Sequence, residues 1–130
     1  MSVRTDTHGQ LLGLRCHDGN MVAVELSKES VELRIVRLDG TSVRVVLEGS
    51  RYFAMDRFLD GNIVNGVFLW PVSSAPTSQR KCAASAFAMS ESMLDAPNEP
   101  GATQLFVLES SYGATVYALV RDVRLLESTS

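Results

Sequence analysis

Residues 31–70 decide the fold of this chain, and they read VELRIVRLDGTSVRVVLEGSRYFAMDRFLDGNIVNGVFLW. Two strand-like runs flank Asp39-Gly40, and two further apolar runs flank Asp60-Gly61. An Asp-Gly pair between such runs is a strong hairpin signal, because both residues accept the backbone angles of tight turns. Asp18-Gly19 repeats the motif upstream, so the three aspartates are spaced by 21 residues. The sequence therefore predicts antiparallel strands whose Asp-Gly turns share one end.

The central hairpin sets the register, because loop length determines which residues face each other. A two-residue loop would place apolar residues opposite charged ones. A three-residue loop of Leu38-Asp39-Gly40, with the glycine in the left-handed conformation, instead gathers the apolar residues on one face. The predicted pairs are Val43 with Ile35, Val45 with Leu33, Leu47 with Val31 and, on the other face, Arg34 with Arg44. Two arginines opposite each other are tolerable only on a face exposed to water.

The same rule extends over five strands of an expected meander. Residues 11–16 and 21–26 flank His17-Asp18-Gly19 and form the first expected hairpin. Short connections at 27–30 and 48–51 keep the apolar side chains on one face. The further predicted pairs are Leu14 with Val22, Leu12 with Val24, Leu26 with Val31, Val24 with Leu33, Val22 with Ile35, Leu47 with Tyr52, and Val45 with Ala54.

Residues 52–70 break this one-faced pattern, because apolar side chains occur on both expected faces. One face carries Tyr52, Ala54, Phe58, Val64, Phe68 and Trp70. The other carries Phe53, Met55, Ile63, Val67 and Leu69. A strand that is apolar on both faces is covered on both, so we expect another element or a partner behind this hairpin.

The rest of the chain adds one helix and a last hairpin. Apolar residues at helical spacing predict a helix over about 78–94, with Thr77 as N-cap and Pro97 as the stop. Strands at 104–109 and 114–121 follow, with Val107 opposite Val116 and Phe106 opposite Tyr117. The expected fold is mainly β. It is an antiparallel meander of about eight strands that closes into a barrel or two packed sheets, with the helix inserted before the C-terminal hairpin.

Composition limits the function classes. The chain has 130 residues, 45% hydrophobic and 21% charged, with a net charge of -3, which is typical of one soluble globular domain. We expect residues 1–10 to be disordered. No cluster of basic residues is present, so neither nucleic acid nor an anionic membrane is an expected partner. Cys16 and Cys82 are expected to be buried and reduced, and residues 1–10 contain no secretory signal, so a cytoplasmic location is expected.

The Asp-Gly turns place polar residues on one rim, namely His17, Asp18, Asp39 and Asp60. Cys16-His17-Asp18 contains the residue types of a nucleophile, a base and an orienting acid. Neighbours along a strand point to opposite faces, however, so these side chains would not converge. The turns also lack the spread of oxygen ligands in an EF-hand. We therefore predict no catalytic residue, no metal and no cofactor, and retain the rim as a candidate shared site.

The second face of residues 52–70 is the preferred contact surface, because a large exposed apolar area normally marks an interface. The ligand or interface candidates are Tyr52, Phe53, Met55, Arg57, Ile63, Val67, Leu69 and Trp70. We predict a non-enzymatic binding or protein-protein interaction module that binds a partner or forms a homodimer. One alternative is a β-barrel that binds a small apolar ligand, lined by Leu14, Val24, Leu33, Val45, Tyr52 and Phe68. A second is an enzyme with its site on the rim.

Overall fold

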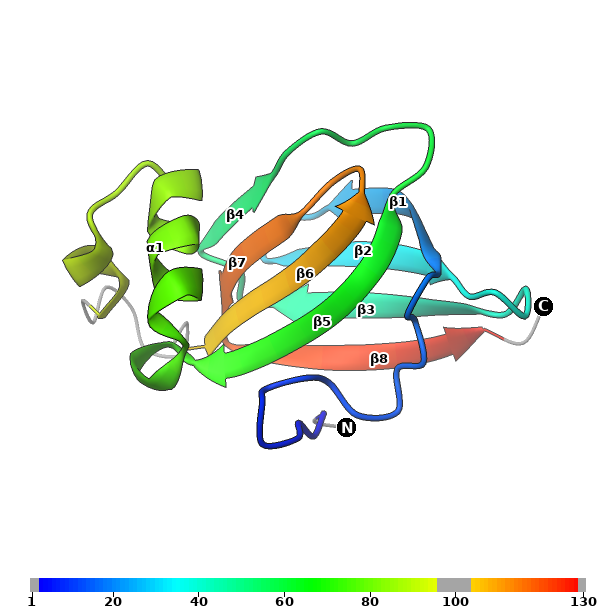
Figure 1. The fold of residues 1–130 in the computed structure, drawn as a ribbon, viewed down its shortest axis with the longest axis horizontal. Helices are drawn as coiled ribbons and strands as arrows, with labels where there is room; N and C mark the ends of the chain where they lie inside the picture. Colours follow the sequence, from blue (N-terminus) through cyan, green and yellow to red (C-terminus); the bar gives the residue numbers. More distant parts are fainter. Residues whose placement is uncertain (1–2, 96–103, 129–130) are drawn as a thin grey trace.

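The computed structural model describes residues 3–95 and 104–128, which contain one sheet of eight antiparallel strands (Figure 1). The strands are β1 (Asn20–Leu26), β2 (Ser30–Val36), β3 (Ser42–Glu48), β4 (Tyr52–Met55), β5 (Ile63–Pro71), β6 (Gln104–Tyr112), β7 (Val116–Val120) and β8 (Asp122–Ser128). Their order in the sheet is β4-β7-β6-β5-β1-β2-β3-β8. The mainly β class and the antiparallel arrangement are confirmed, whereas the sheet is not closed into a barrel.

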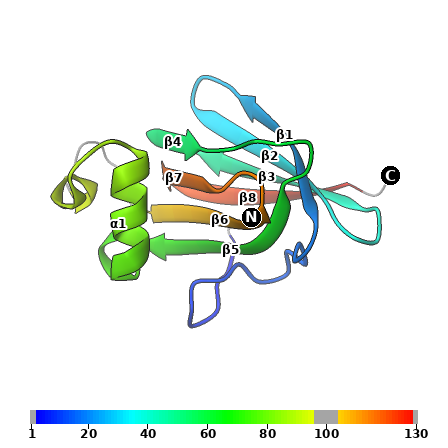
Figure 2. The ribbon, with the colours of Figure 1, turned by 45° about the horizontal axis from the view of Figure 1, so that its top comes forward.

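The sheet bends into two halves of four strands that face each other (Figures 1 and 2). β5 and β1 meet at the single pair of Ile63 with Asn20, and Arg121 alone separates β7 from β8. We call β4, β7, β6 and β5 the helix half, and β1, β2, β3 and β8 the open half. The core draws side chains from both halves, among them Leu33, Val45, Phe106 and Val116, all with 0% exposure.

The central hairpin has the predicted register. Val43 pairs with Ile35, Val45 with Leu33 and Leu47 with Val31, and on the other face Arg34 lies opposite Arg44. Gly40 has a φ of +87°, the left-handed conformation that the three-residue loop requires. Turn chemistry and alternating hydrophobicity therefore determine this hairpin.

The β1–β2 pairing is predicted correctly up to a bulge. Leu26 pairs with Val31 and Val24 with Leu33, as expected. The register then shifts between Met21 and Ala23, so that Met21 pairs with Ile35. The predicted pair of Val22 with Ile35 is wrong, because the bulge turns Val22 outward, where it is 41% exposed.

Three of the predicted strand pairings are wrong. Residues 11–16 form no strand but run alongside β5, where the Leu11 N–H donates to the Val67 carbonyl. β3 pairs with β8, and β4 pairs with β7, so β3 and β4 are not neighbours. Asp60-Gly61 does not close a hairpin either, since β5 pairs with β6. The prediction extended local pairing to strands that meet partners distant in the sequence.

The C-terminal strands differ from the prediction in two ways: the hairpin register is shifted by one residue, and one further strand follows. Val107 pairs with Tyr117 and Leu108 with Val116, so the hairpin register is shifted by one position. The chain forms one more strand after β7. This strand, β8, lies in the open half and pairs with β3 along its whole length. The total of eight strands agrees with the prediction, but β8 replaces the expected strand at 11–16.

The predicted helix is shorter than expected. α1 spans Thr77–Ala86, and a 3-10 segment spans Glu91–Asp95. The helix stops at Phe87 because Ala88 adopts a φ of +57°, which no helix continues. Pro76 occupies the N-cap and Thr77 is the first helical residue, so the predicted cap is wrong. Pro97 lies outside the described residues. Among the described helices, none has the length and apolar character needed to cross a membrane.

The N-terminal residues are in contact with the sheet, although we expected residues 1–10 to be disordered. From residue 3 onward they form a small hairpin, in which Thr5 bridges Leu11. Gln10 forms a bridge with Phe68 of β5, and the Trp70 indole Nε1 donates to the His8 carbonyl at 3.1 Å. The β5 edge, which lacks a long partner on this side, accounts for this ordering.

Candidate interaction surface

Four of the predicted interface residues point into the molecule. Val67 and Leu69 are 3% and 6% exposed and belong to the core between the two halves. Phe53 and Met55 are half-buried and pack against the same core. The opposite half of the sheet covers this face, so it offers no continuous apolar surface to a partner.

The remaining candidates lie on the outer side of the helix half or at its end. Trp70 is 9% exposed and belongs, with α1, to a second apolar cluster, against which Tyr52 also packs. The rings of Tyr52 and Phe87 lie 5.6 Å apart, and Phe68 stacks on Trp70 at 5.3 Å. The prediction that both faces of residues 52–70 are covered is therefore confirmed, with α1 as the outer cover. Ile63 sits at the joint with β1, and Arg57 is exposed in the loop before β5.

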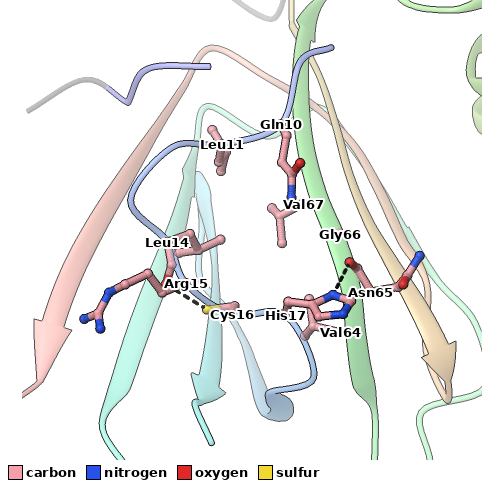
Figure 3. A pocket seen from close by; sticks show the side chains of 10 residues that line it. All are labelled: Gln10, Leu11, Leu14, Arg15, Cys16, His17, Val64, Asn65, Gly66 and Val67. Atoms are coloured by element: carbon pink, nitrogen blue, oxygen red, sulfur yellow. Dashed lines mark hydrogen bonds between the residues drawn. The ribbon is translucent and has the colours of Figure 1, made fainter. Parts of the chain in front are cut away.

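The rim contains a cavity of about 90 Å³ under the loop that precedes β1 (Figure 3). Its lining residues are Gln10, Leu11, Leu14, Arg15, Cys16, His17, Val64, Asn65, Gly66 and Val67. The Arg15 side chain points away from the cavity. The space is far below the roughly 300 Å³ at which small-molecule pockets begin.

Cys16 and His17 do not converge, although they are neighbours. The Cys16 thiol is buried and donates to the Leu14 carbonyl at 3.3 Å, whereas His17 Nδ1 lies 3.0 Å from the Asn65 carbonyl oxygen (Figure 3). Burial raises the pKa of the Cys16 thiol, an effect that nearby Arg37 opposes. A thiol that stays protonated is a poor nucleophile. Cys82, expected to be buried, is exposed on α1.

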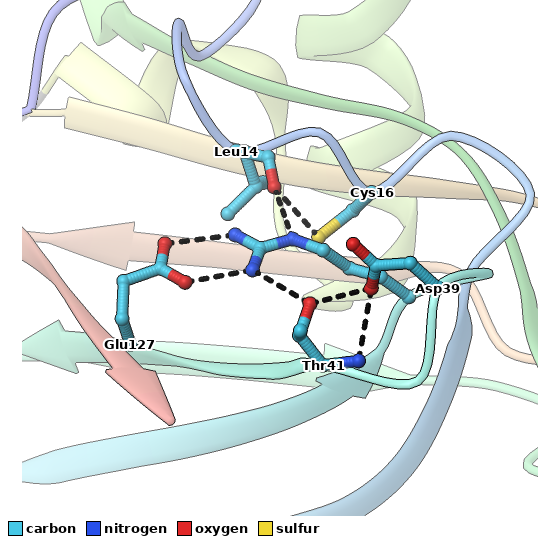
Figure 4. Close-up of polar contacts among 6 residues, drawn as sticks. Leu14, Cys16, Asp39, Thr41 and Glu127 are labelled. Atoms are coloured by element: carbon cyan, nitrogen blue, oxygen red, sulfur yellow. Dashed lines mark hydrogen bonds and ion pairs between the residues drawn. The ribbon is translucent and has the colours of Figure 1, made fainter. Parts of the chain in front are cut away.

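Arg37, in the turn that follows β2, ties the loop that precedes β1 to β8 (Figure 4). Its side chain is 3% exposed and forms a bidentate ion pair with Glu127 of β8, at 2.7 and 2.8 Å. Its Nε donates to the Leu14 carbonyl at 2.9 Å, and Nη1 reaches the Thr41 hydroxyl at 3.3 Å. The network joins three segments, namely the loop before β1, the β2–β3 turn and β8, and is therefore a structural clamp.

The three aspartates of the Asp-Gly pairs have local roles. Asp39 accepts bonds from the Thr41 N–H at 2.9 Å and hydroxyl at 2.6 Å, and these bonds lower the pKa of its carboxyl group. Asp18 lies 3.6 Å from His17 Nε2, with both side chains exposed. Asp60 is exposed in the loop before β5. Within the residues that the structure describes, no group of three or more His, Cys, Asp or Glu side chains could hold a metal ion.

Asn62 joins the two halves at the rim, and sequence analysis did not identify it. It is 1% exposed, and its Oδ1 accepts from the Leu59 and Ala114 N–H groups. Its Nδ2 donates to the Met21 carbonyl at 3.1 Å and to the Leu59 carbonyl at 3.2 Å. These four bonds use both polar atoms of the amide. The role of Asn62 is therefore to satisfy loop backbone groups at the β5–β1 joint.

The outer face of the open half is uncovered in both views (Figures 1 and 2). It forms an open groove of about 450 Å³. The groove residues are Ala23, Glu25, Glu32, Arg34, Ser42, Arg44 and Glu127. We call this surface, together with Val46, Arg124 and Leu126, which share its side of β3 and β8, the charged face.

The charged face places like charges opposite each other. Glu25 pairs with Glu32 across β1 and β2, and Arg34 pairs with Arg44 across β2 and β3. Glu32 lies 3.5 Å from Arg44. In the described part of the chain, neither Glu25 nor Arg34 has an ion-pair partner. Like charges directly opposite destabilise a sheet. The register predicted the Arg34–Arg44 pair, which was the signal for this surface, although neither arginine was among the candidates.

Comparison with known proteins gives no assignment for this chain. No protein-family model, no curated protein and no solved structure matches it.

Proposed function

We propose that the protein is a non-enzymatic protein-protein interaction module and that the charged face is its contact surface. The observation that carries the proposal is the pair of like-charge contacts, Glu25 with Glu32 and Arg34 with Arg44, on an uncovered sheet face. Like charges directly opposite each other cost stability in the isolated chain, and the ion pair of Glu32 with Arg44 offsets only part of that cost. A partner that presents carboxylates to the arginines and cations to the glutamates offsets this cost.

The shape of the charged face supports the same proposal. The groove is open to solvent, and two side chains that border it, Arg44 and Glu32, are 47% and 29% exposed. Leu126, partly exposed on β8, adds an apolar side chain among the charges. Apolar groups surrounded by charged and polar side chains are typical of a protein interface, in which arginine is enriched.

The two alternatives have less support. A barrel for a small apolar ligand needs an empty interior, whereas Leu14, Leu33 and Val45 are buried in a packed core. Two further expected lining residues, Tyr52 and Phe68, pack on the outer side beneath α1. An enzyme on the rim would need Cys16 and His17 to act together on one substrate. Their side chains instead contact different segments, Cys16 at Leu14 and His17 at Asn65.

The proposal is tested with the full chain as bait in a lysate of its source cells. Arg34→Glu reverses one charge on the charged face, and Arg57→Glu makes the same change in the exposed loop before β5 as a matched control. Each captured protein is then purified, and its Kd is measured for the three baits by isothermal titration calorimetry. We expect Arg34→Glu to weaken binding by about 10-fold or more and Arg57→Glu to leave it unchanged. Equal Kd values for all three baits would contradict the proposal.

A further inference from the structure

We infer that the partner seated on the charged face is a second copy of this chain, related by a two-fold axis that lies in the interface. This inference rests on the proposed function, because it names the occupant of the same surface. Its basis is the order of charges along two neighbouring rows of the face, which is complementary to itself.

The two rows run across the strands. The acidic row contains, from β1 to β8, Glu25, Glu32, Val46 and Arg124. The basic row contains, in the same strand order, Ala23, Arg34, Arg44 and Leu126. The rows are adjacent, because outward residues alternate along each strand. One row is acidic on β1 and β2, whereas the other is basic on β2 and β3.

A two-fold axis between the rows and parallel to them exchanges the rows. It turns one copy over and places the acidic row of one copy on the basic row of the other, with each strand opposite itself. Glu32 then faces Arg34 of the second copy, and the symmetry repeats this contact. Glu25 faces the small Ala23, and Arg124 faces Leu126, so no like charges meet directly.

The pairing gives Arg34 an ion-pair partner, whereas Glu25 faces Ala23 and gains none. Arg34 has no ion-pair partner within the described residues of its own chain, and in the pair it gains the Glu32 carboxylate of the other copy. The long arginine side chains have room to extend because the face is hollowed by a groove of about 450 Å³. Both signs of charge occur in neighbouring rows, which favours a self-complementary contact over a partner of one uniform charge.

Sedimentation velocity of the purified full chain, over a concentration series at low salt, tests this inference. We expect reversible dimers that dissociate as salt is added, because the contacts are ionic and partly exposed. Either Arg34→Glu or Glu32→Arg should weaken self-association roughly 100-fold, since the symmetry doubles a loss of about tenfold per contact. Arg57→Glu serves as the control and should associate like the parent chain.

Mixing the two charge reversals distinguishes this geometry from other dimers. In a mixture of Arg34→Glu with Glu32→Arg, both contacts between positions 32 and 34 join opposite charges, so a 1:1 heterodimer should form from two chains that are each monomeric. Circular dichroism establishes that each variant is folded. If Glu32→Arg does not fold, Glu32→Ala replaces it. That variant should lose self-association, and its mixture with Arg34→Glu should keep one of the two Glu32–Arg34 contacts and associate about tenfold more weakly than the parent chain.

Each outcome supports or overturns the inference. A heterodimer formed only on mixing supports it. A parent chain that stays monomeric at low salt overturns it. The proposed interaction function is still supported in that case if Arg34→Glu weakens the binding of captured proteins. If the parent chain forms a dimer that neither charge reversal weakens, self-association uses another surface, and the inference is overturned as well.

Discussion

The two halves of the sheet differ in how many of their faces are covered. In β6 of the helix half, four consecutive residues from Leu105 to Leu108 have 0% exposure. In β2 of the open half, burial alternates, with Leu33 and Ile35 fully buried and Arg34 between them exposed. The helix half carries the core on one side and α1 on the other, whereas the open half has only the core (Figure 2).

This difference explains why the two halves have different sequence patterns. A strand that is covered on both faces reads as a continuous apolar run, and a strand covered on one face alternates. It also locates the surface that is available to a partner, since α1 occupies the outer side of the helix half. A contact surface is therefore expected on the charged face of the open half.

The largest predicted effect comes from comparing two buried residues of the helix half with one exposed residue of the open half. Leu105 and Phe106 point to opposite faces of β6 and are both fully buried, so their alanine variants should each lower the free energy of unfolding by about 3–5 kcal/mol. In β3 of the open half, Arg44→Ala should change it by no more than about 0.5 kcal/mol. Urea unfolding measures all three. A loss below about 1 kcal/mol for Leu105→Ala would show that α1 leaves this face exposed.

An intermediate effect is expected at the clamp that holds the open half to the rim loop. Arg37→Met removes the bonds to Leu14, Thr41 and Glu127, and we expect a loss of about 2–3 kcal/mol, because hydrogen bonds from a buried charged group are lost and the Leu14 carbonyl keeps only the weak Cys16 thiol donor. Glu127 is 53% exposed, so Glu127→Gln should cost only about 1 kcal/mol or less. Urea unfolding at neutral pH measures both. Equal losses for the two variants would contradict the assignment of Arg37 as the buried member.

The same clamp has a defined pH dependence. The hydrogen bonds from Arg37 lower the pKa of Glu127 in the folded chain. The resulting stabilisation is complete above the pKa of an unfolded glutamate, about 4.3, and is lost as the pH falls through the lower folded value. Glu127→Gln should therefore unfold with a shallower loss of stability between about pH 5 and pH 3 than the parent chain.

A local effect is expected at the N-terminal hairpin on the helix half. Gly9 and Gly13 both have a positive φ, +85° and +77°, so alanine costs each about 1–2 kcal/mol. Only at Gly9 would the added Cβ strike Trp70, 2.0 Å from Nε1, whereas at Gly13 nothing lies within 4 Å. Gly9→Ala should displace the hairpin and shift the fluorescence of the single tryptophan to the red. Gly13→Ala, the matched control, should leave the emission unchanged.

Sequence analysis succeeded where structure is local. It predicted the β2–β3 register, the left-handed Gly40 and the β1–β2 pairing as far as the bulge at Val22, because turn residues and alternating hydrophobicity act over a few positions. It also predicted a cover on both faces of residues 52–70. It did not predict Asn62, since an asparagine before a strand carries no signal that its amide will be buried.

The candidate site shows the same limit. Seven of the eight candidates from residues 52–70 are apolar or aromatic, and in six of them that character reflects core packing and the cover by α1, namely Tyr52, Phe53, Met55, Val67, Leu69 and Trp70. Arg34 and Arg44 became notable only when their position on an uncovered face was known, although their pairing was predicted from the register. Whether a charged pair is exposed to solvent or buried against another element depends on the tertiary structure around it.

The sequence by itself determined the β1–β2–β3 meander, because each of its contacts lies within one short connection. Only the tertiary structure decided that β8 pairs with β3 and β4 with β7, because many strands carry compatible apolar faces and the choice between distant edges depends on packing of the whole chain. That choice closes the edge of β3, bends the sheet into two halves and leaves the charged face open.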